Sequence, residues 1–241
     1  MICTDGIRVV GKTVTEVWQT AFNELFYHSL MDESDTSRDG NVSAEILNAI
    51  LIVEDPTRNI LDTPVRKLNT RYAVGELLWY LSGNPHLEAI QLITDAWNRM
   101  SDDGETVNSN YGWCIKNKFR FDQWDYVKQL LRKDPNTRQA VIHIKEAKNT
   151  LEEPTKDLNC TCTLQFLLRK GKLYLTVYMR SNDIWLGTPN DMFAFTCLQM
   201  KMAMELGVEL GSYTHVAGSL HLYERNYKQA KKIVESGEKH E

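Results

Sequence analysis

The sequence predicts an α+β fold in which a mixed β-sheet packs against helices, and three features indicate it. Helical spacing of large apolar residues dominates the first half, where Trp18, Phe22 and Phe26 recur at every fourth position. Strand-like apolar runs dominate the second half, at 139–145, 161–169, 172–180 and 212–222. A long apolar helix is predicted over 191–206, between the last two of these strands. Because helices and strands are largely segregated along the chain, an α+β domain is favoured over repeated βαβ units.

The remaining elements follow from local signals. Helices are predicted over 15–30 and over 71–81, a run rich in Leu, Trp and Tyr, and a polar terminal helix over 223–236. Asn84 and Pro85 predict the start of a further helix, since Asn is a good cap and Pro suits the first turn. Polar loops are predicted over 31–40 and 101–105, and a tight turn at 170–171.

Length and composition predict one domain over residues 1–241, with ordinary values of 42% hydrophobic and 25% charged residues. The net charge of −4 disfavours an electrostatic grip on a nucleic acid polymer. Residues 1–12 lack a signal-peptide pattern, and no run approaches the roughly 18 apolar residues of a membrane helix. Five irregularly spaced cysteines are typical of reduced thiols, so we expect a cytoplasmic protein.

Cys160 and Cys162 flank Thr161 at the start of a predicted strand, so both are expected to face the same side. A Cys-x-Cys pair can bind a metal, but no second pair or Cys/His cluster completes a tetrahedral set, and no metal is expected. Taken alone, such a cysteine is more often a small buried side chain than a nucleophile. The choice between these roles depends on its surroundings.

Arg180 and Ser181 stand at the end of a predicted strand, where an arginine fork and a hydroxyl suit a phosphate monoester. A solvated strand end is the alternative. Glu76 lies in an apolar run and is either a proton-transfer group with a raised pKa or one half of an ion pair with Arg or Lys. Asn190 or Asp191 is a candidate cap for the long apolar helix.

Six segments together resemble the thymidylate synthase family, and within it most closely the phage deoxycytidylate hydroxymethylases. They are GELLWYLSG (75–83), NSNYGW (108–113), NTRQAVI (136–142), CTCTLQF (160–166), YMRSNDIWLGTPND (178–191) and GSLHLY (218–223), in family order. The resemblance is specific because cysteine, arginine and histidine motifs all fall in register. It implies a thymidylate-synthase-like fold whose sheet face forms a homodimer interface.

The resemblance implies roles for individual residues. Cys160 would attack C6 of a pyrimidine nucleoside monophosphate, which makes C5 nucleophilic. Glu76 and Tyr111 would organise water and proton transfers around the base. The phosphate would be held by Arg180 and Ser181, by Arg138 donated across the dimer interface, and by Arg38.

The same resemblance places the sugar and the co-substrate. His221 and Tyr223 would hold the 3′-hydroxyl, although a lone His in such a strand is more often a core residue. Trp97 and Asp183 would contact 5,10-methylenetetrahydrofolate, which carries the transferred carbon.

Position 191 distinguishes two branches of the family. Thymidylate synthases place an asparagine four residues after the glycine that matches Gly187, and it reads uracil. Asp191, beside Asn190, instead matches the deoxycytidylate hydroxymethylases, because a carboxylate accepts from the amino group of cytosine and stabilises a proton at N3. Thr161 in place of a family histidine, and the segment 108–113, also match that branch. The implied substrate is dCMP, and water would complete a hydroxymethyl group.

Two features depart from the family pattern. Gln139 replaces the second arginine of a phosphate-binding pair, and few residues follow 223–236 where thymidylate synthases carry a tail over the folate. Methyl transfer to dCMP or CMP, hydroxymethylation of CMP, and thymidylate synthesis from dUMP remain open on the same scaffold. A non-enzymatic alternative is an inactive member that binds a nucleotide as a regulator.

Overall fold

The computed structural model describes residues 6–28, 42–146 and 155–237, with side chains through residue 233. Within these ranges seven strands form one sheet in the order β1-β2-β7-β5-β4-β3, and β6 pairs with β7 off this path. The strands are β1 (Ile7–Gly11), β2 (Ser43–Val53), β3 (Val141–His143), β4 (Thr161–Arg169), β5 (Lys172–Met179), β6 (Asn182–Asp183) and β7 (Glu209–Tyr223).

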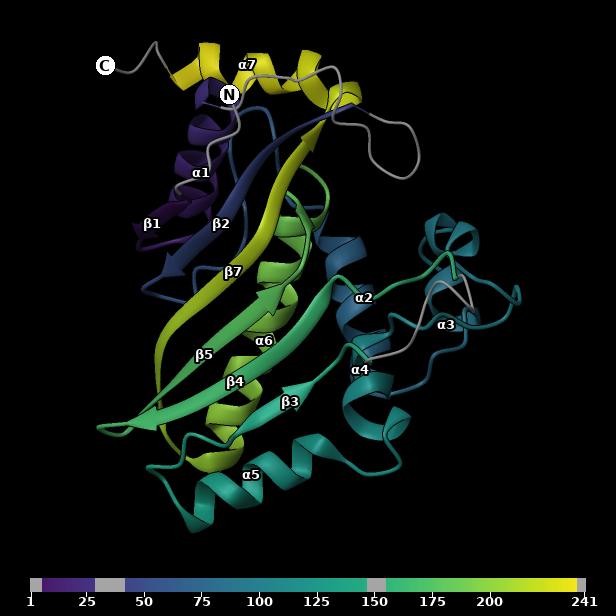
Figure 1. The fold of residues 1–241 in the computed structure, drawn as a ribbon, viewed down its shortest axis with the longest axis vertical. Coiled ribbons are helices and arrows are strands. Elements are labelled where there is room, and N and C mark those ends of the chain that lie inside the picture. Colours follow the sequence, from purple (N-terminus) through teal and green to yellow (C-terminus); the bar gives the residue numbers. More distant parts are fainter. Residues whose placement is uncertain (1–5, 29–41, 147–154, 238–241) are drawn as a thin grey trace.

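Strand β7 is the centre of this sheet, because it pairs with β2 in antiparallel and with β5 and β6 in parallel orientation. The pair β1–β2 is parallel, whereas β3–β4 and β4–β5 are antiparallel. The predicted mixed sheet is therefore confirmed. Figure 1 shows the long β7 ribbon running from the β5 side of the sheet to the β2 side.

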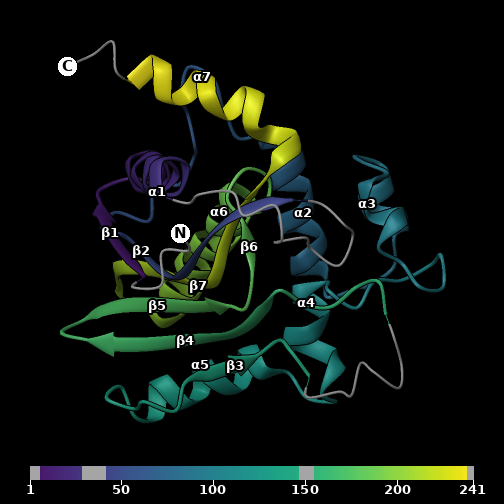
Figure 2. The same cartoon turned by 45° about the horizontal axis from the view of Figure 1, so that its top comes forward.

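The helices are α1 (Val14–His28), α2 (Thr70–Ser82), α3 (Glu88–Gln91), α4 (Tyr111–Trp113), α5 (Gln123–Lys133), α6 (Gly187–Leu206) and α7 (Tyr227–Gly237), with short turns η1 (Ala96–Arg99), η2 (Cys114–Lys118) and η3 (Glu224–Asn226). Helix α6 packs against β5 and β7 behind the sheet, with α2 at its side (Figure 1). No described helix crosses in front of β4, β5 and β7 in that view. Figure 2 shows α1 beside β1 and β2, and α5 beneath β3.

Local chemistry explains where these elements begin and end. Helix α2 starts where the side chain of Asn69 accepts a hydrogen bond from the amide of Tyr72 at 3.2 Å, and it ends at Gly83 with φ of 67°. The β4–β5 turn places Lys170 at φ 50° and Gly171 at φ 74°, as a two-residue turn that follows the sheet twist requires. This turn was predicted from the sequence and is confirmed.

Other expectations need correction. Asn84 and Pro85 do not open a helix. The Asn84 side chain accepts from the amide of His86, and residues 85–87 pair with residues 105–107, so α3 starts only at Glu88.

Neither Asn190 nor Asp191 is a helix cap, since α6 already begins at Gly187. Strands β1 and β2 and helix α5 were not predicted. The loop expected over 31–40 lies outside the described residues.

A buried aromatic cluster fixes α1 to the start of α6. Trp18 stacks on Phe22 with ring centroids 4.9 Å apart, and both side chains are fully buried. The indole Nε1 of Trp18 donates to the carbonyl of Ile184 at 2.7 Å. A buried N–H with such a partner satisfies its hydrogen-bonding need and fixes position. The segment that leads into α6 is thereby held against the core.

None of the helices in the described part of the chain is long and apolar enough to cross a membrane.

Close contact between α2 and α4 depends on Gly112. A Cβ at this position would lie 1.5 Å from the backbone oxygen of Tyr80. We therefore expect Gly112→Ala to lower the free energy of unfolding by about 3 kcal/mol or more, because two backbones must separate. Urea denaturation checks this expectation. Gly104→Ala is the control, since its Cβ meets nothing within 4 Å and only its positive φ of 81° costs about 1 kcal/mol. Equal losses in both variants would contradict the packing account.

Candidate active site

Cys160 lies directly before β4, beside the end of β5. The amide of Arg180 donates to the carbonyl of Cys160 at 2.8 Å. The guanidinium of Arg180 donates to the carbonyls of Asn159 and Leu158, each at 3.1 Å, and its Nη2 lies 3.7 Å from the Cys160 sulfur. A fixed cation beside a half-buried sulfur favours the thiolate form. Cys160 is therefore a candidate nucleophile.

Ser181 and His221 meet where β6 pairs with β7. The Ser181 hydroxyl lies 3.4 Å from Nδ1 of His221, and the rings of His221 and Tyr223 pack edge to face with centroids 4.9 Å apart. Burial lowers the pKa of His221 below its ordinary value, while the charge of Asp183 opposes that shift. A neutral imidazole that both accepts and donates hydrogen bonds suits a hydroxyl group.

Asp191 is the fifth residue of α6 and is only partly exposed to solvent. Its Oδ2 accepts a hydrogen bond from Nδ2 of Asn182 at 2.8 Å. Desolvation raises the pKa of Asp191 to about 8, with a further contribution from the charge of Glu76, although the Asn182 bond acts in the opposite direction. The raised pKa favours the protonated form of this side chain in the free protein.

Glu76 on α2 is 5% exposed, and its Oε1 accepts from the hydroxyl of Tyr72 at 2.6 Å. Burial raises the pKa of Glu76 to about 7, while hydrogen bonds from Tyr72 and Tyr80 partly offset this effect. Nε1 of Trp97 donates to the Tyr72 hydroxyl at 3.1 Å and so joins the same chain. Of the two sequence-based interpretations of Glu76, the raised pKa is confirmed, and among the described residues tyrosine hydroxyls rather than a cation are its partners.

Tyr111 lies close enough to Cys160, Asp191 and Glu76 for their charges to affect its pKa. Its buried ring stacks on Phe195 at 5.5 Å and lies 5.0 Å from the ring of Tyr80. Burial raises the pKa of Tyr111 well above its ordinary value, followed by the charges of Asp191 and Cys160. The phenol is thus neutral and available as a hydrogen-bond donor.

Gly187 and Asp183 shape the turn into α6. Oδ1 of Asp183 accepts from the amides of Trp185 at 2.8 Å and Leu186 at 3.1 Å. A Cβ on Gly187 would lie 3.0 Å from Nδ2 of Asn182, so a larger residue would press on the hydrogen bond to Asp191. The side chain of Asn190 donates to the carbonyl of Leu186 at 2.9 Å.

One predicted phosphate ligand, Arg138, does not join this group. Its carbonyl accepts from Gln165 at 3.0 Å in the middle of β4, about 17 Å along the strand from Cys160 at the usual rise per residue. Arg38 lies outside the described residues.

The structure adds side chains that sequence reasoning missed: Tyr72, Tyr80, Asn182, Tyr213 and His215. Tyr72 stands four residues before Glu76, and this helical spacing could have identified it. Asn182 was part of the segment 178–191 but had no assigned role. Its partners come from β7 and α6, so only the folded chain reveals them.

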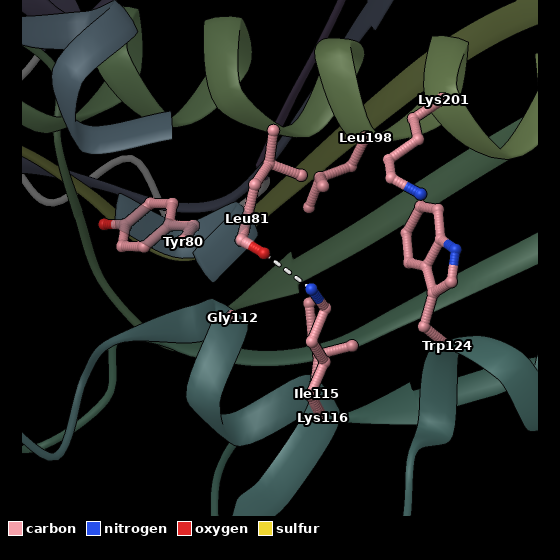
Figure 3. Close-up of a pocket in the computed structure, with 8 residues that line it drawn as sticks. All are labelled: Tyr80, Leu81, Gly112, Ile115, Lys116, Trp124, Leu198 and Lys201. Atoms are coloured by element: carbon pink, nitrogen blue, oxygen red, sulfur yellow. Dashed lines mark hydrogen bonds between the residues drawn. The ribbon is translucent and has the colours of Figure 1, made fainter. Parts of the chain in front are cut away.

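Within the described ranges, no three His, Cys, Asp or Glu side chains gather as a metal site. Figure 3 shows a cavity between α2, α4, α5 and α6 whose lining does not include Cys160 or Asp191. Its lining residues are Tyr80, Leu81, Gly112, Ile115, Lys116, Trp124, Leu198 and Lys201. Nζ of Lys116 donates to the carbonyl of Leu81 at 2.5 Å across it. This cavity lies behind Tyr80 and is separate from the cluster around Cys160.

Comparison with known proteins agrees with this arrangement. Residues 24–241 match the thymidylate synthase family. The chain is 34% identical over 195 residues to the deoxyuridylate hydroxymethyltransferase of Bacillus phage SP01, covering 76% of this chain and 51% of that protein. The chain thus spans about half the length of that curated relative. Its fold matches the thermostable thymidylate synthase A from Bacillus subtilis with a TM-score of 0.75 and 24% identity, over 92% of this chain and 83% of that one.

A mixed sheet of this topology, with a cysteine and an arginine beside β4 and β5 and two carboxyl groups from α2 and α6, defines an α+β protein of the thymidylate-synthase-like fold. The chain belongs to the thymidylate synthase family. The expected resemblance to the thymidylate synthase family and the expected α+β fold are confirmed.

The two raised carboxyl pKa values predict a pH-dependent stability of the free protein. Both exceed the ordinary values of 4.5 for Glu76 and 3.8 for Asp191, so the protonated forms stabilise the fold at low pH. This contribution is lost as the pH rises from about 4 through about 8. We expect Asp191→Asn to melt about 5 °C above the parent protein at pH 9, the shift that roughly 2 kcal/mol produces in a chain of this size.

Thermal melting between pH 5 and 9 measures this difference, and exposed Glu54 provides the control substitution Glu54→Gln. The control should follow the parent protein at every pH. If the stability of Asp191→Asn fell with rising pH as steeply as that of the parent protein, ionisation of Asp191 would not be the cause of the pH dependence.

Proposed function

We propose that this protein is a one-carbon transferase that converts dCMP to 5-hydroxymethyl-dCMP, with Cys160 as the nucleophile. The observation that carries this proposal is a carboxyl group at position 191, whose pKa is raised by burial, in a cluster that also contains Cys160 and Arg180. Family membership supports a pyrimidine nucleotide as substrate, and the phage relative supports hydroxymethyl transfer.

A protonated carboxyl group complements the edge of cytosine. Its O–H donates to the unprotonated N3, and its carbonyl oxygen accepts from the exocyclic amino group. With a pKa of about 8, Asp191 holds that proton near neutrality. Uracil offers a donor at N3 and an acceptor at O4, so its O4 would face the acceptor oxygen as long as the proton of Asp191 stays on the oxygen that faces N3. Mispaired buried polar groups of this kind discriminate strongly between ligands.

The chemistry follows from the positions of these groups. The thiolate of Cys160 forms a bond to C6, the electron pair of the C5=C6 double bond shifts through the ring to N3, and Asp191 gives its proton to N3. The ring is then neutral, and C5 becomes a nucleophile. Glu76, with a pKa of about 7, is suited to hold or release a proton through the neighbouring tyrosine hydroxyls. Tyr111 contributes a neutral hydroxyl to the same network.

The remaining parts of the nucleotide are assigned by matching chemistry. Arg180 and Ser181 bind the phosphate, and His221 with Tyr223 binds the 3′-hydroxyl. Arg180 already donates to backbone carbonyls, so its guanidinium is pre-oriented. Base recognition extends from Asp191 to the neighbouring Asn190 and Gly187.

The residues around Trp97 fit 5,10-methylenetetrahydrofolate, which when bound supplies the carbon at the oxidation level of formaldehyde. The Trp97 ring is half-buried and held by its hydrogen bond to Tyr72, so it offers a fixed aromatic surface for a flat heterocycle. Asp183 is held by two backbone amides and offers a carboxylate to ring N–H groups.

We further propose a homodimer in the cytoplasm. The sheet face without a described helix carries partly exposed Ile50 and Tyr178, which is consistent with a partner subunit there. Arg138 is exposed and distant from its own Cys160, as a residue donated to the partner's phosphate would be.

Hydroxymethylation of dUMP is the second candidate, and the name of the phage relative favours it. The carboxyl group of Asp191 favours dCMP over dUMP, because its protonated form pairs with N3 and the amino group of cytosine. The two candidates differ in base recognition and in the atom that receives the electron pair on addition at C6, which is N3 in cytosine and O4 in uracil.

The role of the nucleophile is tested by exchange of the C5 hydrogen of dCMP into solvent. Exchange requires addition at C6, so it should occur in the parent protein and fall by at least about 1000-fold in Cys160→Ala. Cys162→Ala is the matched control and should retain exchange. Exchange that survives in Cys160→Ala but is lost in Cys162→Ala would transfer the role to the second thiol.

Recognition of the base is tested by Asp191→Asn. The amide presents a donor to O4 and an acceptor to N3–H, so the ratio of kcat/KM for dCMP over dUMP should fall by about 100-fold or more. Steady-state kinetics with product identification by mass measures both the ratio and the group added. An unchanged ratio would remove Asp191 from base recognition, and a CH₃ product would remove the hydroxymethyl assignment.

A further inference from the structure

A buried hydrogen-bonded chain runs from Asp191 into the sheet. Asn182 donates to Oδ2 of Asp191 at 2.8 Å, its Oδ1 lies 3.0 Å from Nε2 of His215, and Nδ1 of His215 lies 2.8 Å from the hydroxyl of Tyr213. Asn182 is 3% exposed, and His215 and Tyr213 are fully buried. These hydrogen bonds thus connect the site to fully buried side chains in the protein interior.

The donor and acceptor roles along this chain are fixed by chemistry. Burial lowers the pKa of His215 to about 4, so the ring is neutral and carries one proton. Because Oδ1 of Asn182 can only accept, that proton sits on Nε2, and Nδ1 accepts from the Tyr213 hydroxyl. The hydroxyl of Thr188 donates to the same Oδ1 at 2.5 Å. Two donors therefore hold the oxygen of Asn182 inward and its amino group toward Asp191.

This orientation has a consequence for the carboxyl group. Oδ2 of Asp191 accepts from Asn182, so a proton on the carboxyl group resides on Oδ1. With the Asn182 amide reversed, its oxygen would face Oδ2 and draw the proton there. The orientation of one buried amide thus determines which carboxyl oxygen can give a proton to the substrate.

We propose that Asn182 is a positioning and specificity residue, which keeps the proton of Asp191 on the oxygen that faces the base, and that His215 and Tyr213 lock Asn182 in this orientation. The proposal rests on the assignment of Asp191 to base recognition. Gly187 supports it, because a Cβ at this position would lie 3.0 Å from Nδ2 of Asn182 and 3.4 Å from Oδ2 of Asp191 and would press on the bond between them.

The first test is the tautomer of His215 in the intact protein. Nitrogen-15 NMR of the histidine rings at pH 7 should show His215 neutral with its proton on Nε2, with His215→Gln used to assign the signal. Tyr213→Phe removes a single hydroxyl and the donor to Nδ1, so the Nδ1–H form should become populated. A proton on Nδ1 in the parent protein would overturn the proposal.

The second test is kinetic. Tyr213→Phe should lower kcat for dCMP by about tenfold, the effect of one buried hydrogen bond, and change KM by less than about threefold. Asn182→Ala should lower kcat further and reduce the ratio of kcat/KM for dCMP over dUMP. Tyr174→Phe also deletes a hydroxyl, but on β5 and outside the hydrogen-bonded series from Asp191 to Tyr213. It should leave kcat, KM and the ratio of kcat/KM for the two nucleotides unchanged. An unchanged kcat and ratio in both Tyr213→Phe and Asn182→Ala would refute the proposal.

These results separate this proposal from the proposed function. If the parent protein turns over dUMP and not dCMP, the assignment of cytosine fails. The His215 tautomer, and the effect of Tyr213→Phe on the nucleotide that is turned over, still decide whether Asn182 positions Asp191. If Asn182→Ala fails to fold, Tyr213→Phe and the NMR signal of the parent protein decide the question.

Discussion

Two carboxyl groups share one desolvated site, and this constraint governs the chemistry of the whole cluster. Glu76 comes from α2 and Asp191 from α6, and the charge of Glu76 contributes to the raised pKa of Asp191. Burial raises the pKa of both groups, so near neutrality the site retains a proton where exposed carboxyl groups would have lost theirs. The surrounding side chains, Tyr72, Tyr80 and Asn182, are all donors that tolerate either state. A site that must move protons on a pyrimidine ring benefits from this reserve.

The fold holds this pair in place through β7. Two of its buried residues, His215 and Tyr213, lie in the hydrogen-bonded chain with Asn182. Near its end, His221 lies beside Ser181. The bond from Trp18 to the carbonyl of Ile184 fixes the segment between Asp183 and α6. Sheet, helix and turn therefore converge on the N-terminal part of α6, where Asp191 lies.

Much of the fold was predictable because its signals are local. Three elements could be predicted without tertiary information. They are helix α1, from the spacing of Trp18, Phe22 and Phe26, and strands β4 and β5, from their apolar runs and the turn at 170–171. Strand β2 and helix α5 were missed, and Asn84 and Pro85 were misinterpreted because pairing with residues 105–107 overrides a capping signal. In the site, Cys160, Arg180 and Asp191 were found through their motifs. Asn182 and His215 were not, because their roles depend on contacts between strands that lie far apart in sequence.

The central claim is that the sulfur of Cys160 and the carboxyl group of Asp191 address the same pyrimidine ring. A crystal structure of the protein with bound dCMP tests it most directly. We predict that N3 and the exocyclic amino group lie within hydrogen-bonding distance of Asp191, while C6 lies over the Cys160 sulfur. A nucleotide whose base contacts only one of these two side chains, with the other facing a separate cavity, would contradict it.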